Sequence, residues 1–230
     1  MMRGYSAEQV RAAEAPHLAA GEPLMQVAAA GLAAVIRDEL AELEDLATAA
    51  DVLLLVGSGN NGGDALFAGA ELAASGCRVA VVELGSRVPE AGLVAARNAG
   101  AVVVDLGHDP VAAVVQAATD ADVIVDGILG TGAFRSPALR GVARDVVTAL
   151  RPVAASPRRR VVAVDLPSGI DPDSGELPDQ AVLPADVTVT FGACKAGLLR
   201  DPGAMYAGRI VLVDLGLAAD LEGVEPLVTD

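Results

Sequence analysis

A stretch rich in glycine and asparagine runs from Gly57 to Asp64, after an apolar run over residues 52–56 and before an alanine-rich segment. The apolar run is typical of a buried strand, and the segment that follows is typical of a helix. Glycines at such a turn let backbone N–H groups approach a phosphate, and the N-terminus of a helix favours negative charge. The stretch therefore predicts a site for a ligand that carries phosphate.

Three later apolar runs of the chain also end in charged residues. Asp126 lies near the end of the run over residues 123–128, and Asp165 lies near the end of the run over residues 161–166. Lys195 follows a third run shortly after its end. Ligands of open parallel sheets bind outside the carboxyl ends of the strands. We therefore expect these side chains at the same edge of a sheet as the glycine-rich stretch.

Three of the residues near these strand ends could bind a cation. Asn61, Asp126 and Ser168 would supply an amide oxygen, a carboxylate and a hydroxyl, which is an all-oxygen set with one formal negative charge. Oxygen ligands suit hard cations, and Ca²⁺ sites usually contain more carboxylates. A monovalent ion such as K⁺ fits this charge better. The alternative is that Asp126 caps nearby amides or pairs with Lys195, because an unpaired carboxylate in an apolar strand would be costly.

Asp165 is the best candidate for a general acid or base. It stands at a strand end just before Pro167, and a carboxylate in such a place can be held rigidly while it faces a ligand. The alternative is that it caps the loop that follows. His17 and His108 lie outside the strand-end loops and are expected to be ordinary surface or capping residues.

The glycine-rich stretch also fits the fingerprint of dinucleotide-binding dehydrogenases. Gly57, Gly59 and Gly62 satisfy G-x-G-x-x-G, and Glu83 stands about 20 residues further on, where an acidic residue would bind the ribose of NAD. An NAD-dependent dehydrogenase is therefore an alternative. It leaves unexplained the polar side chains of the turn and the two later aspartates.

Apolar runs alternate with helical segments along the chain. Runs typical of buried parallel strands occupy residues 52–56, 79–84, 102–106, 123–128, 161–166, 187–191 and 210–215. Helices are predicted at about 6–20 and 24–46 before the first run, and at 62–75, 89–99, 110–119 and 137–150 after it. This alternation predicts one domain over residues 1–230, an α/β protein with a three-layer αβα Rossmann-like sandwich and a mostly parallel sheet. Two helices precede the first strand.

Capping motifs predict where three of these helices begin. Ser6 and Gln9 form a capping box, with Ser at the N-cap and Gln three residues on. Asp109-Pro110 and Ser136-Pro137 each combine an N-cap residue with a proline at the first helical position. We therefore expect helices to start at these three places.

The composition excludes several classes of partner. The 230 residues carry a formal net charge of −15, and only 2% of them are aromatic, with no Trp. Such a chain repels nucleic acids and anionic membranes and lacks aromatic platforms for single strands. Cys77 and Cys194 show no metal-ligand spacing and are expected to be reduced structural thiols. The chain shows no signal-peptide core and no apolar run long enough for a membrane span, so we expect a cytoplasmic protein.

Four motifs in order resemble those of the NAD(P)HX epimerase family, the YjeF N-terminal domain. They are Asn60-Asn61-Gly62-Gly63-Asp64, Asp126 followed by Gly130-Thr131-Gly132, the stretch from Asp165 to Asp171, and Lys195-Ala196-Gly197. The resemblance extends from about Ser6 to Leu217. It implies an isomerase of coenzyme repair, which interconverts the R and S hydrates of NADH and NADPH.

The resemblance also implies roles for individual residues. Asn61, Asp126 and Ser168 would bind K⁺, and Asp165 would be the catalytic acid or base. Substrate contacts would come from Asn60, Asn61, Gly62, Gly63, Asp64, Gly130, Thr131, Gly132, Ala133, Phe134, Arg135, Ser136 and Asp165. The partner implied is the small molecule NADHX or NADPHX, with functional coupling to an ADP- or ATP-dependent dehydratase on a separate chain or on the same full-length chain.

Two further matters stay open on the sequence alone. A non-catalytic module that binds a nucleotide or another partner is a third function class beside the epimerase and the dehydrogenase. The Ala-rich N-terminal helix pair could form the contact of a homodimer. We expect no nucleic acid and no membrane among the partners.

Overall fold

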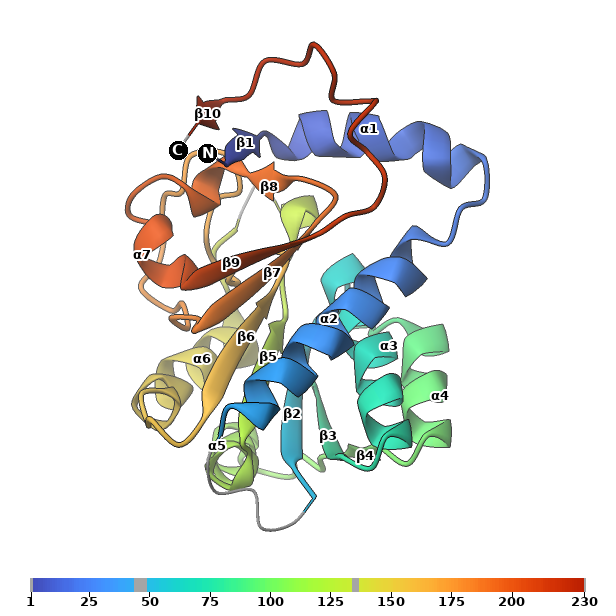
Figure 1. Cartoon of the computed structure of the whole chain (residues 1–230). Helices are drawn as coiled ribbons and strands as arrows, with labels where there is room; N and C mark the ends of the chain where they lie inside the picture. The colour runs from blue at the N-terminus through green and yellow to red at the C-terminus, as the bar shows by residue number, and fades with distance from the viewer. Residues whose placement is uncertain (1, 44–48, 134–136, 230) are drawn as a thin grey trace.

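A computed structural model describes residues 2–43, 49–133 and 137–229. Within these ranges seven strands form one parallel sheet in the order β4-β3-β2-β5-β6-β7-β9 (Figure 1). The strands are β2 (Asp51–Val56), β3 (Arg78–Glu83), β4 (Val102–Val103), β5 (Val123–Gly127), β6 (Arg160–Val164), β7 (Val187–Phe191) and β9 (Arg209–Val213). The order reverses at β2, between β3 and β5. That switch point is where open α/β sheets bind their ligands.

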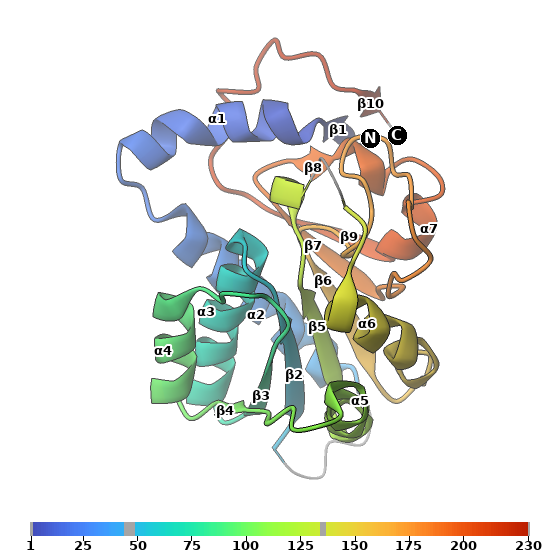
Figure 2. The same ribbon diagram turned by 180° about the vertical axis from the view of Figure 1, so that it is seen from behind.

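Helices cover both faces of the sheet, as expected for a three-layer αβα protein (Figures 1 and 2). One face packs against α2 (Leu24–Ala41), α3 (Asn60–Ala74) and α4 (Glu90–Asn98), and the other against α5 (Pro110–Asp120) and α6 (Gly141–Ala154). Alternate strand residues serve the two layers, with Leu54 facing α2 and α3 and Leu55 facing α5 and α6. The apolar-throughout strands of the sequence are thus explained by burial on both faces.

The first helix, α1 (Ala7–Ala19), lies across the carboxyl edge of the sheet and lines a cavity there. Its predicted capping box is present: the hydroxyl of Ser6 accepts from Gln9 N at 3.0 Å, and the Gln9 side chain accepts from Ser6 N at 2.8 Å. The predicted cap at Asp109 is present as well, and it accepts a hydrogen bond from Ala112 N at 3.0 Å. Both capping motifs fix the start of their helices.

A second, small sheet joins the two ends of the chain and was not predicted. It consists of β1 (Arg3–Tyr5), which pairs in parallel with β8 (Cys194–Lys195) and antiparallel with β10 (Val228–Thr229). The two expected early helices therefore precede the first strand of the large sheet, but β1 precedes them both. Tyr5 lies opposite Lys195 in this register. The small sheet thus fixes the segment of Lys195 and the start of α1 in the same place.

Several predicted boundaries differ from the observed ones. The helix expected over residues 137–150 begins only at Gly141, whose φ of +53° is outside the helical region, so the helix does not extend back to Pro137. Ser136, its expected cap, lies outside the described residues. The strand expected up to residue 166 ends at Val164, because Asp165 takes a φ of +67°. The strand expected over residues 102–106 pairs only at its first two residues.

The described residues also bear on the other sequence expectations. Both cysteines are free, Cys77 half-buried and Cys194 buried. Of the helices in the described ranges, none is by itself long and apolar enough to cross a membrane; α1 and α2 reach that length and composition only as a pair bent by 117°.

Candidate functional site

The glycines of the turn between β2 and α3 allow backbone segments to approach closely. Gly57 N donates to Gly127 O at 3.0 Å, and a Cβ on Gly57 would lie 1.7 Å from the carbonyl oxygen of Ile128. A Cβ on Gly62 would lie 2.3 Å from the oxygen of Gly57. A Cβ on Gly59, in contrast, would meet nothing within 4 Å. Two of the glycines are therefore needed for packing, and the third faces open space at the start of α3.

A cavity of about 620 Å³ lies beside this turn. Its size is that of a site for a small ligand or part of a nucleotide. Among the described residues that line this cavity, Arg140, just before α6, is the charged one. The first N–H groups of α3 have no partner within the helix and can bind an anion. The wall comprises residues 57–61, 84–85, 128–132, 138–140 and 143.

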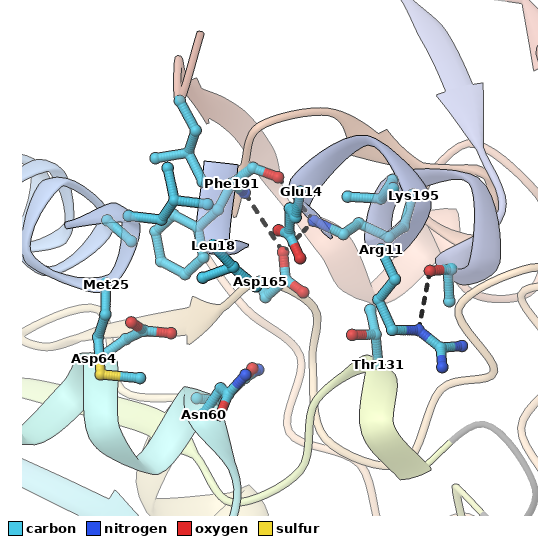
Figure 3. A pocket seen from close by; sticks show the side chains of 16 residues that line it. Arg11, Glu14, Leu18, Met25, Asn60, Asp64, Thr131, Asp165, Phe191 and Lys195 are labelled. Atoms are coloured by element: carbon cyan, nitrogen blue, oxygen red, sulfur yellow. Dashed lines mark hydrogen bonds and ion pairs between the residues drawn. The ribbon is translucent and has the colours of Figure 1, made fainter. Parts of the chain in front are cut away.

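A second cavity, of about 120 Å³, lies on the other side of Asn60, Asn61 and Thr131, which line both cavities. Side chains from α1, α2, α3 and the ends of β6, β7 and β8 surround it (Figure 3). Its other lining residues include Arg11, Glu14, Leu18, Met25, Asp64, Asp165, Phe191 and Lys195. A ligand that spans both cavities would thus pass from a glycine-rich wall to an acidic one.

Asp165 is held in this second cavity by hydrogen bonds to one of its oxygens. Its Oδ1 accepts from the ammonium of Lys195, from Thr190 Oγ1 at 3.2 Å and from Phe191 N at 3.3 Å. Among the described residues other than glycine, Asp165 is the one with a positive φ, of +67°. The buried Lys195, 2% exposed, additionally donates to Phe191 O at 2.8 Å. The partners of Asp165 are therefore not in the loop that follows it, so it does not cap that loop. Lys195 forms its ion pair with Asp165 and not with Asp126.

Two more acidic side chains line the same cavity. Asp64 is 5% exposed, and burial, with a further contribution from the charge of Asp165, raises its pKa to about 8. Burial also raises the pKa of the half-buried Glu14 on α1, while the charge of Lys195 opposes the shift. Three carboxyl groups thus share this small cavity with the ammonium of Lys195 and the guanidinium of Arg11.

The three residues expected to bind a cation come together around the backbone of Leu129. Ser168 Oγ donates to Asp126 Oδ1 at 2.6 Å and accepts from Leu129 N at 2.8 Å. The amide of Asn61 donates to Leu129 O at 3.2 Å. Asp126 also accepts from Ser168 N at 2.8 Å, so it does cap an amide. Burial raises the pKa of Asp126, and the hydrogen bonds from Ser168 oppose the shift.

The remaining predicted contact residues occupy different places. Gly62 and Gly63 pack beneath the turn, against Gly57 and against Met25, while Gly130 and Gly132 line the larger cavity. Ala133 ends a short 3₁₀ turn, η1 (Thr131–Ala133). Three predicted contacts, Phe134, Arg135 and Ser136, lie outside the described residues.

Residues weighed for other roles lie apart from the two cavities. Glu83, the acidic residue of the dehydrogenase fingerprint, is 3.7 Å from Arg97 in an ion pair and does not line either cavity. His17 pairs with Glu22 and Asp220, and His108 is exposed, as expected for surface residues.

The sequence interpretation missed the contribution of α1. Arg11 and Glu14 line the acidic cavity although they precede the first strand of the large sheet by some forty residues in the chain. Their spacing of three positions, which places both on one face of a helix, was the available signal. A helix before the first strand has no fixed place in this fold class, so the signal could not be tied to the site.

Comparison with known proteins identifies close relatives. The family model described as YjeF-related protein N-terminus matches residues 21–197. A protein of Clavibacter michiganensis subsp. michiganensis named NAD(P)H-hydrate epimerase is 53% identical, over 98% of this chain and 94% of that protein. A protein of the same name from Microbacterium testaceum is 51% identical, over 98% of this chain and 83% of that protein.

Two further relatives extend the comparison. The bifunctional NAD(P)H-hydrate repair enzyme Nnr of Mycobacterium tuberculosis is 40% identical to this chain. The match covers 94% of this chain and 42% of that protein. The crystal structure of the yeast protein ynu0 (YNL200c) has a TM-score of 0.75 and covers 100% of this chain and 97% of that chain at 19% identity. At that identity the yeast structure shows the same fold and nothing more.

Proposed function

Because the chain belongs to the family of the YjeF-related protein N-terminus, we propose that it is an isomerase that interconverts the R and S hydrates of NADH and NADPH. Its relatives at 51–53% identity carry the name NAD(P)H-hydrate epimerase. The observation that carries the proposal is the pair of adjoining cavities, one beside a glycine turn and one lined by carboxyl groups. A dinucleotide hydrate needs both, for its phosphates and for its reacting ring.

We assign the phosphates of the substrate to the larger cavity. The net charge of −15 repels anions at long range, so local groups have to bind them. The N-terminal N–H groups of α3 and the side chain of Arg140 are such groups. Asn60 and Thr131, which line both cavities, would then contact the ribose and the ring end of the substrate.

Asp165 is the proposed acid or base at the reacting ring. The hydrogen bonds that described residues donate to its carboxylate all fall on Oδ1, so Oδ2 can exchange a proton with the substrate or with water. The hydroxyl group would leave the ring and return on the opposite face. The contact with Lys195 fixes the orientation of the carboxylate during both events.

We propose K⁺ as the cation of the site at Asn61, Asp126 and Ser168. The residues fit such an ion, because Asp126 and Ser168 supply oxygen atoms side by side and the Asp126 carboxylate, 1% exposed, pairs with no Lys or Arg within the described ranges. Asn61, which donates its NH2 group to Leu129 O, would turn its amide oxygen toward the ion. The set carries one formal negative charge, that of Asp126, which suits a monovalent ion better than Ca²⁺. When bound, the ion supplies the positive charge that this buried carboxylate lacks.

The proposed product connects this reaction to a second one. The S hydrate is the form that an ADP- or ATP-dependent dehydratase would return to the coenzyme. The relative from M. tuberculosis is named as a bifunctional repair enzyme and is more than twice as long as the matched region. We propose that such a dehydratase is the functional partner of this chain.

Conversion of one hydrate into the other tests the proposed function. The protein is incubated with R-NADHX, and S-NADHX is followed by chromatography against a sample without protein, with R-NADPHX tested in parallel. We expect S-NADHX to form faster than in the control. A dehydrogenase would act only with a second, oxidisable substrate, and a binding module would leave both hydrates at the spontaneous rate.

A further inference from the structure

Two aspartates line the acidic cavity from different structural elements. Asp64 projects from α3 near its N-terminus, and Asp165 follows β6 (Figure 3). Each is at most 5% exposed, and both side chains are directed into the same cavity. Asp165 is the proposed acid or base at the reacting ring, whereas Asp64 is expected only to contact the substrate.

The two carboxyl groups have opposite surroundings. Asp165 accepts three hydrogen bonds on Oδ1, one of them from an ammonium, as an ionised carboxylate does. No described residue donates a hydrogen bond to the carboxyl group of Asp64, and burial raises its pKa to about 8. The charged and titratable groups that line the cavity with it are Asp165, Lys195 on β8, and Glu14 and Arg11 on α1. Near neutral pH one aspartate can therefore carry a proton while the other accepts one.

The reaction itself calls for two such groups. A hydroxyl that departs from one face of a flat ring needs a proton donor on that face, and water that returns from the opposite face needs a proton acceptor there. A single carboxyl group fixed by Lys195 reaches one face of a bound ring.

We propose that Asp64 is a second catalytic acid/base, acting on the face of the hydrated nicotinamide ring opposite to Asp165. The inference rests on the proposed epimerase function and goes beyond it by dividing the proton transfers between two residues.

The step is balanced without any additional reactant. The carboxylic acid of Asp64 gives its proton to the departing hydroxyl, the C–O bond breaks, water leaves, and the lone pair of the ring nitrogen forms a C=N bond. A water molecule on the opposite face then forms a new C–O bond with the same carbon, the C=N electrons return to the nitrogen, and Asp165 accepts the proton. Exchange with solvent returns the proton from Asp165 to Asp64. The two residues exchange roles in the reverse direction.

The central experiment compares Asp64→Asn with wild type in both directions, from pH 6 to pH 9. Glu71→Gln is the matched control, because it removes a carboxylate from the same helix at an exposed position away from the cavities. We expect Asp64→Asn to slow both directions by about 10²-fold or more, as for the loss of a general acid. The wild-type rate should fall above about pH 8. The residual rate of Asp64→Asn should not decrease above pH 8 in this way, and the rate of Glu71→Gln should depend on pH as that of wild type does.

Two further measurements keep the proposal open to refutation if Asp64→Asn folds poorly. Wild-type epimerisation in H₂¹⁸O should place one ¹⁸O in the product per event, and retention of ¹⁶O would overturn the proposed exchange of water. Binding of NADPH, measured by its fluorescence, should weaken far less in Asp64→Asn than the rate falls. A loss of binding equal to the loss of rate would make Asp64 a binding residue only and overturn the proposal.

The outcomes separate this inference from the proposed function. If wild type epimerises and Asp64→Asn stays within about threefold of it, Asp64 has no catalytic role and the epimerase assignment stands. If wild type itself does not accelerate epimerisation, the function is wrong and the inference fails with it.

Discussion

Lys195 donates a hydrogen bond from its ammonium group to Oδ1 of Asp165, although the two residues are 30 positions apart in the chain. Both side chains are buried. The pair is held from two sides, since Asp165 follows β6 of the large sheet and Lys195 lies in β8 of the small sheet, which pairs with the N-terminal strand β1. The small sheet therefore has a function: it presents a cation to the proposed catalytic carboxylate.

Removal of this cation should destabilise the protein strongly. In Lys195→Met the carboxylate of Asp165 stays buried without its charged partner, which costs about 3–5 kcal/mol. At about 2–4 °C per kcal/mol for a chain of this size, Tm should fall by roughly 10 °C. Thermal unfolding followed by circular dichroism measures the change.

The matched control is Arg78→Met, which removes the exposed ion pair with Asp51. Exposed pairs contribute little, so this variant should melt close to wild type. Equal losses in the two variants would contradict the special role of the buried pair.

Asp165→Asn should abolish most of the proposed activity. The amide cannot accept a proton from substrate or water, so the rate of conversion of R-NADHX should fall by about 10²–10⁴-fold. Chromatography of the hydrates at a fixed time measures the rate. Asp105→Asn, at an exposed loop position, is the control. A wild-type rate in Asp165→Asn would exclude Asp165 as the acid or base.

Much of the site could be predicted because parallel strands end at one edge of the sheet. The carboxyl ends of β2, β5 and β6 carry Asn61, Asp126 and Ser168, which do come together around Leu129. Apolar-throughout runs predicted the seven strands of the large sheet well, since burial on both faces leaves a continuous signal.

The rest depends on contacts that no periodicity encodes. Strands of two or three residues, such as β1 and β8, are too short to show alternation, so the small sheet could not be seen. Without it, nothing indicated that Lys195 would face Asp165 rather than Asp126. The start of α6 was misplaced because Pro137 is a good first helical residue in sequence, whereas the backbone turns at Gly141.

Potassium should stabilise the protein if it is the proposed ion. Tm of wild type is measured in KCl and in choline chloride at equal ionic strength, and we expect a higher Tm in KCl, because an ion that binds only the folded state raises its stability. Asp126→Asn should lose this difference, since the buried charge that attracts the cation is gone. A K⁺-dependent shift of the same size in Asp126→Asn would exclude Asp126 as a ligand.

Two glycines of the turn should respond differently to the same substitution. Gly57→Ala places a methyl group 1.7 Å from the oxygen of Ile128, so the backbone has to shift at a cost of at least about 1–3 kcal/mol. Gly59→Ala meets no atom within 4 Å, so it should unfold close to the wild-type temperature. Its methyl group faces the cavity assigned to the phosphates, so KM for R-NADHX should rise instead. Equal Tm values for the two variants would contradict the close packing at Gly57.

The stability of the protein should fall as the pH rises from about 4 to about 8. The ordinary pKa of an aspartate in an unfolded chain is near 3.8, whereas burial raises that of folded Asp64 to about 8. Between these values the folded state holds a proton that the unfolded state has lost, so this contribution is fully present below pH 4 and is lost as the pH passes through 8. Burial of Asp126 and Glu14 acts in the same direction. Tm measured at pH 5.5 and pH 8.5 should therefore decrease by several degrees in wild type and by less in Asp64→Asn, whose amide has no proton to lose, whereas Glu71→Gln should keep the wild-type decrease. A decrease in Asp64→Asn as large as that in wild type would show that Asp64 is ionised in the folded state, and it would remove the proton that the second catalytic acid has to carry.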